Sequence, residues 1–142
     1  MVSRKILITF GVFAVLAIGI GSVCAVQNVE IDGIKFTIPD GYAEDMKMAK
    51  NGEVDKNGFK TFDHTYFDSN HNMLSVTVFY DGNNVDFNSL KGSGDVEKTI
   101  KGHKGWFEFD KESELYFFTY IDNNKVVMIT AEDDGLFEKV IV

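Results

Sequence analysis

The chain has 142 residues, and 22 Asp or Glu against 14 Lys or Arg give a formal net charge of −8 at pH 7. Such an acidic chain is a poor partner for nucleic acid, because affinity for the phosphate backbone depends on basic side chains. The single cysteine, Cys24, excludes a disulfide within the chain. The length suffices for one domain with one hydrophobic core.

An uncharged stretch begins at Ile6 and ends at Val26, and it contains twelve Leu, Ile, Val or Phe residues. As a helix it is long enough to cross the hydrocarbon core of a bilayer. Basic residues precede the stretch at positions 4 and 5, and the first charged residue after it is Glu30. This distribution predicts a cytoplasmic N-terminus and an extracytoplasmic remainder.

The sequence therefore predicts two parts, with residues 1–26 as a transmembrane anchor or a signal peptide and residues 27–142 as an extracytoplasmic domain. The signal-peptide alternative depends on Val23, Cys24 and Ala25, which offer small residues where a signal peptidase cuts. The domain is membrane-anchored in the first case and secreted in the second. Beyond residue 25 the net charge is −10, so we expect membrane contact through the apolar stretch rather than through an electrostatic patch.

From Gln27 onward, short alternating runs are separated by Asp-Gly, Asn-Gly and Asn-Asn pairs, a pattern typical of antiparallel hairpins. Residues 29–31 and 34–38 predict a first hairpin, because Asp32 and Gly33 suit a two-residue turn with positive φ angles. Residues 42–50 fit either a strand or a helix, and their alternation favours a strand.

Two Asn-Gly pairs, at positions 51–52 and 57–58, are expected to bracket a polar turn before a strand over residues 59–67. Residues 73–80 give the clearest strand, with Leu74, Val76 and Val78 on one face. Residues 82–105 contain five glycines and one short helix near residues 87–90, so this segment is expected to be flexible and to cover any binding site.

A final meander is expected over residues 106–121 and 125–131, with these strands at the centre of the sheet. Asp133 or Asp134 is expected to cap a last helix that covers one face of the sheet. Its apolar side is formed by Leu136, Phe137, Val140 and Ile141. The predicted fold class is α+β: a mostly antiparallel β-sheet with a C-terminal helix packed on one face, preceded by an N-terminal hydrophobic helix.

The run from Phe36 to Tyr42, a later Leu-Ser-Val-Thr-Val strand and a closing hairpin with a C-terminal helix together resemble the PsbP and Mog1-like superfamily. The chain also looks similar to small exported archaeal proteins that have not been characterised. The superfamily resemblance implies an α+β sandwich that acts as an assembly or interaction module. It implies no active site and no particular partner.

Two groups of residues are candidates for a metal site. Asp68, Ser69, Asn70, His71 and Asn72 alternate oxygen ligands like a calcium loop, but Met73 and Phe79 occupy the positions that an EF-hand gives to Gly and Glu. A polar hairpin turn is the simpler interpretation, with weak surface calcium as the alternative.

The histidines His64, His71 and His103 are spread over three segments and lack the spacing of a catalytic zinc site. His64 is expected to be a packed histidine on a strand. His71 and His103 are expected to be exposed loop residues. The sequence therefore assigns no catalytic residue, cofactor or metal ligand.

Other candidates also have structural explanations. Glu112 with Glu114, and Asp133 with Asp134, could do acid-base chemistry but fit turns or caps. The aromatic residues are numerous enough to line an apolar cleft as well as a core. They are Phe62, Tyr66, Trp106, Phe107, Phe109, Tyr116, Phe117, Phe118 and Tyr120.

The favoured hypothesis is a membrane-tethered or exported module that binds an envelope protein or an apolar ligand, without catalysis. Its binding surface is expected on a sheet face or on the glycine-rich segment. The alternative is an extracytoplasmic hydrolase or metal-dependent enzyme that uses His64 or His103 with loop carboxylates.

Overall fold

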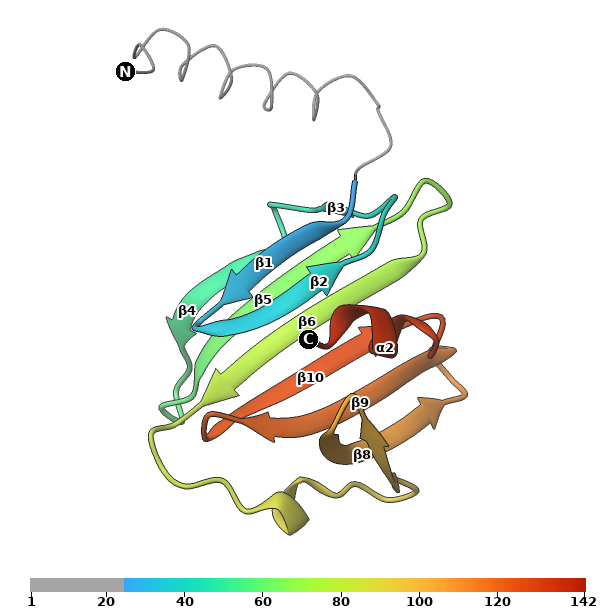
Figure 1. Ribbon diagram of the computed structural model, residues 1–142. Coiled ribbons are helices and arrows are strands. Elements are labelled where there is room, and N and C mark those ends of the chain that lie inside the picture. The colour runs from blue at the N-terminus through green and yellow to red at the C-terminus, as the bar shows by residue number, and fades with distance from the viewer. Residues whose placement is uncertain (1–24) are drawn as a thin grey trace, which may run out of the picture.

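The structure, a computed structural model, describes residues 25–142 (Figure 1). The predicted transmembrane or signal segment lies outside the described residues, apart from its last two. Within residues 25–142, no helix is long and apolar enough to cross a membrane. This part of the chain is built around one eight-stranded sheet in the order β3-β5-β6-β10-β9-β8-β7, and β4 also pairs with β5.

All pairs in this sheet are antiparallel, and β10 lies at its centre. Its strands are β3 (Ala43–Glu44), β4 (Lys50–Val54), β5 (Lys60–Phe67), β6 (Met73–Tyr80), β7 (Val96–Ile100), β8 (His103–Asp110), β9 (Leu115–Asp122) and β10 (Lys125–Ala131). The predicted antiparallel sheet with one small C-terminal helix is thus confirmed.

The alternation of side chains gives this sheet one apolar face, which we call the inner face. Leu74, Val76 and Val78 of β6 are fully buried on it. The register continues this face across the neighbouring strands, since Val76 is opposite Ile129 and Ile129 is opposite Phe118. The period-two pattern of the sequence therefore identifies the core face correctly.

A two-stranded hairpin, β1 (Gln27–Ile31) and β2 (Ile34–Ile38), covers the inner face over β5 and β6 (Figure 1). Its turn is the predicted one, with φ of 48° at Asp32 and 83° at Gly33. The Lys125 ammonium at the start of β10 lies 2.9 Å from an Asp32 carboxylate oxygen and donates to the Asp32 carbonyl at 2.6 Å. This contact fixes the hairpin turn to the centre of the sheet.

A one-turn helix, α2 (Leu136–Val140), covers the inner face beside the hairpin (Figure 1). The prediction that Asp133 or Asp134 caps it is wrong. Gly135 is the N-cap residue and no side chain bonds to the first turn; the Asp133 carboxylate instead accepts a hydrogen bond from the Gly135 amide at 2.9 Å. Because Gly135 already has helical φ and ψ, Asp133 closes a turn that precedes the helix rather than the helix end itself.

The hairpin, α2 and the inner face enclose one hydrophobic core. Its fully buried members from the two covering elements include Phe36, Ile38, Phe137 and Val140. These side chains pack on sheet residues that include Tyr66, Leu74, Val76, Val78, Phe118, Tyr120, Val127 and Ile129.

The segment over residues 42–54 differs from the prediction. The expected strand is only the two-residue β3, and the first Asn-Gly pair lies inside β4, where the pairing register shifts between Asn51 and Glu53. Gly52 has φ of 93°, so it supplies the backbone conformation of a β-bulge rather than of a turn. The turn itself spans residues 55–59, where Asp55 accepts hydrogen bonds from two backbone amides.

The glycine-rich segment is also more ordered than its composition indicates. The predicted short helix is present as η1 (Phe87–Leu90), but β7 forms the edge of the sheet and β8 already begins at His103. Most side chains of β7 are exposed, including Glu97 and Lys98. An exposed edge strand lacks the apolar alternation on which its prediction depends.

Candidate functional site

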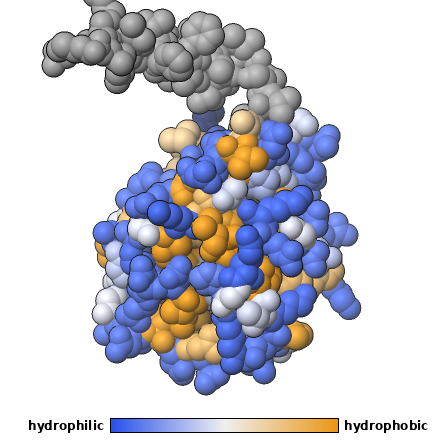
Figure 2. Space-filling view, viewed as in Figure 1, coloured by the Kyte–Doolittle hydropathy of each residue, from blue (hydrophilic) through white to orange (hydrophobic). Residues whose placement is uncertain are grey.

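The hairpin and α2 lie over the centre of the inner face, and towards β8 and β7 this face becomes more open, although Phe137 of α2 still contacts Phe107 of β8. This side of the sheet carries an apolar and aromatic group, which we call the aromatic surface: Val96 and Phe109 are exposed, and Phe107 and Tyr116 are partly buried against the core. The register places these residues on one face, with Val96 opposite Phe107 and Phe109 opposite Tyr116. Val96 is 58% exposed and Phe109 is 42% exposed. Figure 2 shows apolar patches between the polar groups on this side of the molecule.

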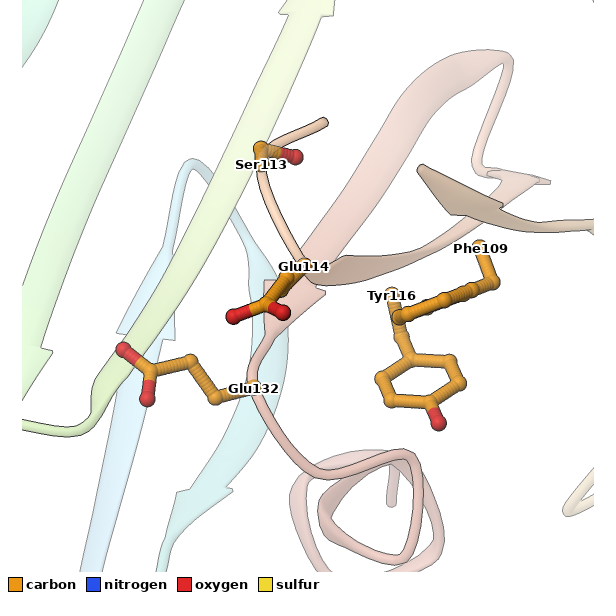
Figure 3. Close-up of a pocket in the computed structure, with 5 residues that line it drawn as sticks. All are labelled: Phe109, Ser113, Glu114, Tyr116 and Glu132. Atoms are coloured by element: carbon orange, nitrogen blue, oxygen red, sulfur yellow. The ribbon is translucent and has the colours of Figure 1, made fainter. Parts of the chain in front are cut away.

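A cleft of about 430 Å³ opens at one end of the aromatic surface (Figure 3). Phe109 from β8 and Tyr116 from β9 form one wall. The other lining residues are Ser113 and Glu114, from the turn between these strands, and Glu132, which follows β10. Because Ala131 is opposite Tyr116, the chain brings Glu132 beside the beginning of β9. The antiparallel order of β10, β9 and β8 thus assembles the cleft.

The cleft combines two aromatic rings with two carboxylates. The ring centroids of Phe109 and Tyr116 are 4.5 Å apart, with planes at 37°. Figure 3 shows the carboxylates of Glu114 and Glu132 on the side of the cleft away from the rings. One Glu132 oxygen accepts a hydrogen bond from the Met73 amide at 3.1 Å, which holds this carboxylate in place.

The turn that carries Glu114 is held by the neighbouring Asp110. The Ser113 hydroxyl donates to an Asp110 carboxylate oxygen at 2.7 Å, and the Glu112 amide donates to the other oxygen at 3.1 Å. These two hydrogen bonds lower the pKa of Asp110 below its usual value, and the bond from Ser113 has the larger effect. Glu114 has φ of 58°, a left-handed conformation that costs a non-glycine residue about 1–2 kcal/mol. Glu114 lines the cleft with its carboxylate on the side away from the rings.

This arrangement suits a cation. The faces of aromatic rings attract ammonium and guanidinium groups, and carboxylates pair with them. One cation–aromatic contact of this kind is present on the aromatic surface: the Lys98 ammonium lies 3.4 Å from the centroid of the Phe107 ring. Within residues 25–142, no lysine or arginine lies over Phe109 or Tyr116.

His64 lies on the inner face of β5 and contacts a carboxylate from β3, which lies 20 residues earlier in the sequence. Its Nδ1 atom is 2.6 Å from a carboxylate oxygen of Glu44 on β3, and both side chains are less than a quarter exposed. A carboxylate can orient an imidazole in this way for structural or chemical purposes. Tyr66 lies nearby, and its pKa is raised to about 12, mainly by burial and to a smaller extent by the charge of Glu44.

The three histidines are not brought together. The His103 ring packs on Tyr120 with centroids 4.7 Å apart, so His103 belongs to β8 and not to an exposed loop as expected. His71 is exposed in the turn before β6 and has φ of 64°. Among residues 25–142, no group of three or more His, Cys, Asp or Glu side chains is placed to hold a metal ion.

The loop over residues 68–72, for which a polar turn is predicted with weak calcium binding as the alternative, is a turn stabilised by Asp68. One oxygen of its carboxylate accepts hydrogen bonds from the amides of Asn70 and Asn72, each at 2.9 Å. The other oxygen accepts from the Asn72 side chain at 2.8 Å, and this bond makes the largest contribution to a lowered Asp68 pKa. The Asp68 carboxylate is therefore used by the turn itself.

Part of the cleft is predictable from the sequence. Phe109 and Tyr116 are among the aromatic residues predicted to line a cleft or the core, and Glu114 is one of a predicted pair of acids. The structure pairs Glu114 with Glu132 across the cleft instead of with Glu112. Ser113 and Glu132 were missed, because nothing near them in the sequence indicates which strands lie side by side.

The chain was compared with protein-family models, with curated proteins and with solved structures, and none of them matches. The resemblance to the PsbP and Mog1-like superfamily therefore remains a prediction. Any function must be argued from the cleft and the surfaces around it.

Proposed function

We propose that the chain is a membrane-tethered or exported binding module, without catalysis, that holds a basic side chain of another envelope protein in its cleft. The observation that carries this proposal is the combination of the Phe109 and Tyr116 rings with the Glu114 and Glu132 carboxylates around one opening. An apolar ligand alone would contact the rings but would not pair with the Glu114 and Glu132 carboxylates. A lysine or arginine uses the rings and the carboxylates together.

Net charge supports the same class of partner. Beyond residue 25 the chain has a net charge of −10, which attracts basic segments and accelerates their encounter. The exposed side chains of Phe109 and Val96 on the aromatic surface offer apolar contact area beside the cation site. Aromatic side chains in a partly enclosed position are typical of the residues that dominate protein interfaces.

A binding titration tests this proposal. The full chain in detergent micelles is titrated with an acetylated and amidated hexalysine peptide, and Kd is measured by calorimetry at low ionic strength. Phe109→Ala is expected to weaken binding by about tenfold, since truncating a central aromatic contact removes more than about 1 kcal/mol. The double variant Glu114→Gln with Glu132→Gln is expected to weaken it at least as much.

Glu112→Gln is the matched control, because it removes one negative charge from the same turn without touching the cleft. General attraction between an acidic protein and a basic peptide would respond equally to Glu112→Gln and Glu114→Gln. Equal responses, or an unchanged Kd for Phe109→Ala, would contradict the proposal.

A second candidate function, an extracytoplasmic hydrolase or metal-dependent enzyme, is favoured only by the contact between Glu44 and His64. Hydrolysis of ester or peptide substrates that disappears with His64→Gln would support it. The binding module is the better supported proposal, because the cleft does not contain either residue.

A further inference from the structure

Three large apolar side chains are exposed around the start of β1. Val26 is 58% exposed, Met46 is 71% exposed and Met48 is 48% exposed. We call these three residues the methionine corner. Met46 and Met48 belong to the turn between β3 and β4, and Val26 directly precedes β1.

Hydrogen bonds hold the parts of the methionine corner near one another. The Gln27 side chain donates to the Tyr42 carbonyl at 3.2 Å, so the beginning of β1 lies beside the residue that precedes β3. The Asp45 amide donates to the Thr65 carbonyl at 2.8 Å, and the Met48 amide donates to the Asp45 carbonyl at 3.0 Å. These bonds close the turn that projects Met46 and Met48. Figure 1 shows the start of β1 and β3 at the same corner of the domain.

The position of the methionine corner indicates what covers it. The chain enters the domain here directly from its uncharged stretch, which ends at Val26. We propose that the methionine corner rests in the headgroup region of the lipid layer that holds this stretch. The inference depends on the membrane-tethered form of the proposed function.

The chemistry of the corner suits a lipid surface. Methionine is flexible and apolar, so it can enter the boundary between headgroups and acyl chains without a fixed partner shape. Lys47 and Lys50 are exposed beside it and can keep their ammonium groups at the level of the headgroups. Since the domain as a whole is acidic, the apolar contact and not charge attracts it to the lipid, and zwitterionic lipid is sufficient.

The methionine corner and the cleft are separate sites on the domain. Four strand spacings separate β3 from β9 in the sheet order β3-β5-β6-β10-β9. At about 4.8 Å for each spacing, the cleft lies roughly 19 Å across the sheet from the methionine corner. The residues that line the cleft are therefore separate from those of the methionine corner.

Fluorescence quenching by brominated lipid tests the contact. The full chain is placed in phosphatidylcholine vesicles with or without bromine on the acyl chains, and Met46→Trp is compared with the parent chain. The only native tryptophan, Trp106, is 7% exposed and stacks on Phe87, so it supplies a constant background. Bromine is expected to reduce the emission of the introduced tryptophan by about two-fold, because the side chain enters the interfacial region.

Val54→Trp is the matched control. Val54 is 64% exposed but lies at the other end of β4, opposite Lys60, where β5 begins. Its tryptophan is expected to show no quenching beyond the parent chain. Met48→Trp is expected to reproduce the result of Met46→Trp. Quenching of Met46→Trp and Met48→Trp no greater than that of Val54→Trp would overturn the inference.

Vesicle flotation distinguishes failure of the membrane tether from failure of the lipid contact at the methionine corner. If the parent chain does not float with the vesicles, the tether is wrong and the inference is overturned with it. If the chain floats but Met46→Trp is unquenched, the tether stands and only the contact is wrong. Blue-shifted but unquenched emission at Met46→Trp would show that protein, and not lipid, covers the corner.

Discussion

Phe36 and Ile141 form an antiparallel β-bridge that joins β2 to the residue directly after α2. Both side chains are at most 1% exposed. The bridge links the first hairpin of the domain to its C-terminal segment, although the two are far apart in the sequence. The hairpin and α2 therefore form one continuous cover over the inner face, and Phe137 of α2 extends this cover to Phe107 of the aromatic surface.

Phe137 is the fully buried aromatic side chain of α2 in this cover. Its ring lies against Phe107 and Phe118, with centroid distances of 6.1 Å and 6.0 Å. Phe137→Ala is expected to lower the free energy of unfolding by about 3–5 kcal/mol, because it leaves a cavity under α2. Val142→Ala, at an exposed position, is expected to change it by less than about 0.5 kcal/mol. Urea unfolding measures both, and similar values for the two variants would contradict this view of the core.

Gly105 permits the close approach of β8 to β9. A Cβ atom added there would lie 2.6 Å from both the Cζ atom of Phe118 and the carbonyl oxygen of Thr119. Gly105→Ala is therefore expected to destabilise the domain by about 1–3 kcal/mol, since one of the clashing atoms belongs to the backbone.

Gly135→Ala provides the comparison for Gly105. Its Cβ would meet only a carboxylate oxygen of Asp133, at 3.1 Å, which is the end of a flexible side chain. Gly135 has φ of −62°, which alanine adopts freely. We expect a much smaller change in the urea midpoint for Gly135→Ala than for Gly105→Ala. Equal changes would show that the packing of Gly105 on Phe118 is not tight.

Tyr66 is expected to make stability sensitive to alkaline pH. Burial, with a smaller effect of Glu44, raises its pKa to about 12, whereas the unfolded chain has a value near 10. A raised pKa favours the neutral phenol in the folded state, so this contribution is complete below pH 10 and is lost as pH rises toward about 12. Tyr66→Phe is expected to reduce the slope of stability against pH in that window. An unchanged slope would assign the loss to Tyr120, whose pKa burial also raises.

The contact between Glu44 and His64 is expected to contribute more than an exposed ion pair. A double-mutant cycle with alanine at both positions should give a coupling of about 1 kcal/mol, because both side chains are largely buried. The pair of Lys104 and Glu97, with both side chains more than half exposed, should give less than about 0.5 kcal/mol. If the two couplings are equal, burial does not strengthen the Glu44–His64 contact.

The turns show how much of the fold local sequence can predict. Asp32 and Gly33 form the expected tight turn because both positive φ angles come from adjacent residues. Gly52 has an equally positive φ, but its bulge depends on how β4 pairs with β5, which lies later in the sequence. The same local signal therefore has two structural outcomes, and only the pairing distinguishes them.

The cleft likewise depends on strand pairing that local sequence does not show. Its aromatic residues were recognisable as candidates because their number exceeds what a thin core needs. Glu132 joins them only because β10 lies next to β9, with Ala131 opposite Tyr116. Strand order is a long-range property, so period-two patterns can predict the faces of strands but not the side chains that meet at their ends.

The most direct test of the binding module is photo-crosslinking from position 109 in native membranes. A photoreactive phenylalanine analogue replaces Phe109 in the full chain, and a second chain carries it at Val54, which is exposed and distant from the cleft. We predict one specific adduct from position 109, attached to a partner segment that contains lysine or arginine. This adduct should disappear when Glu114→Gln and Glu132→Gln are added. Adducts of equal yield from both positions, or an adduct at position 109 that survives the loss of both carboxylates, would contradict the proposal.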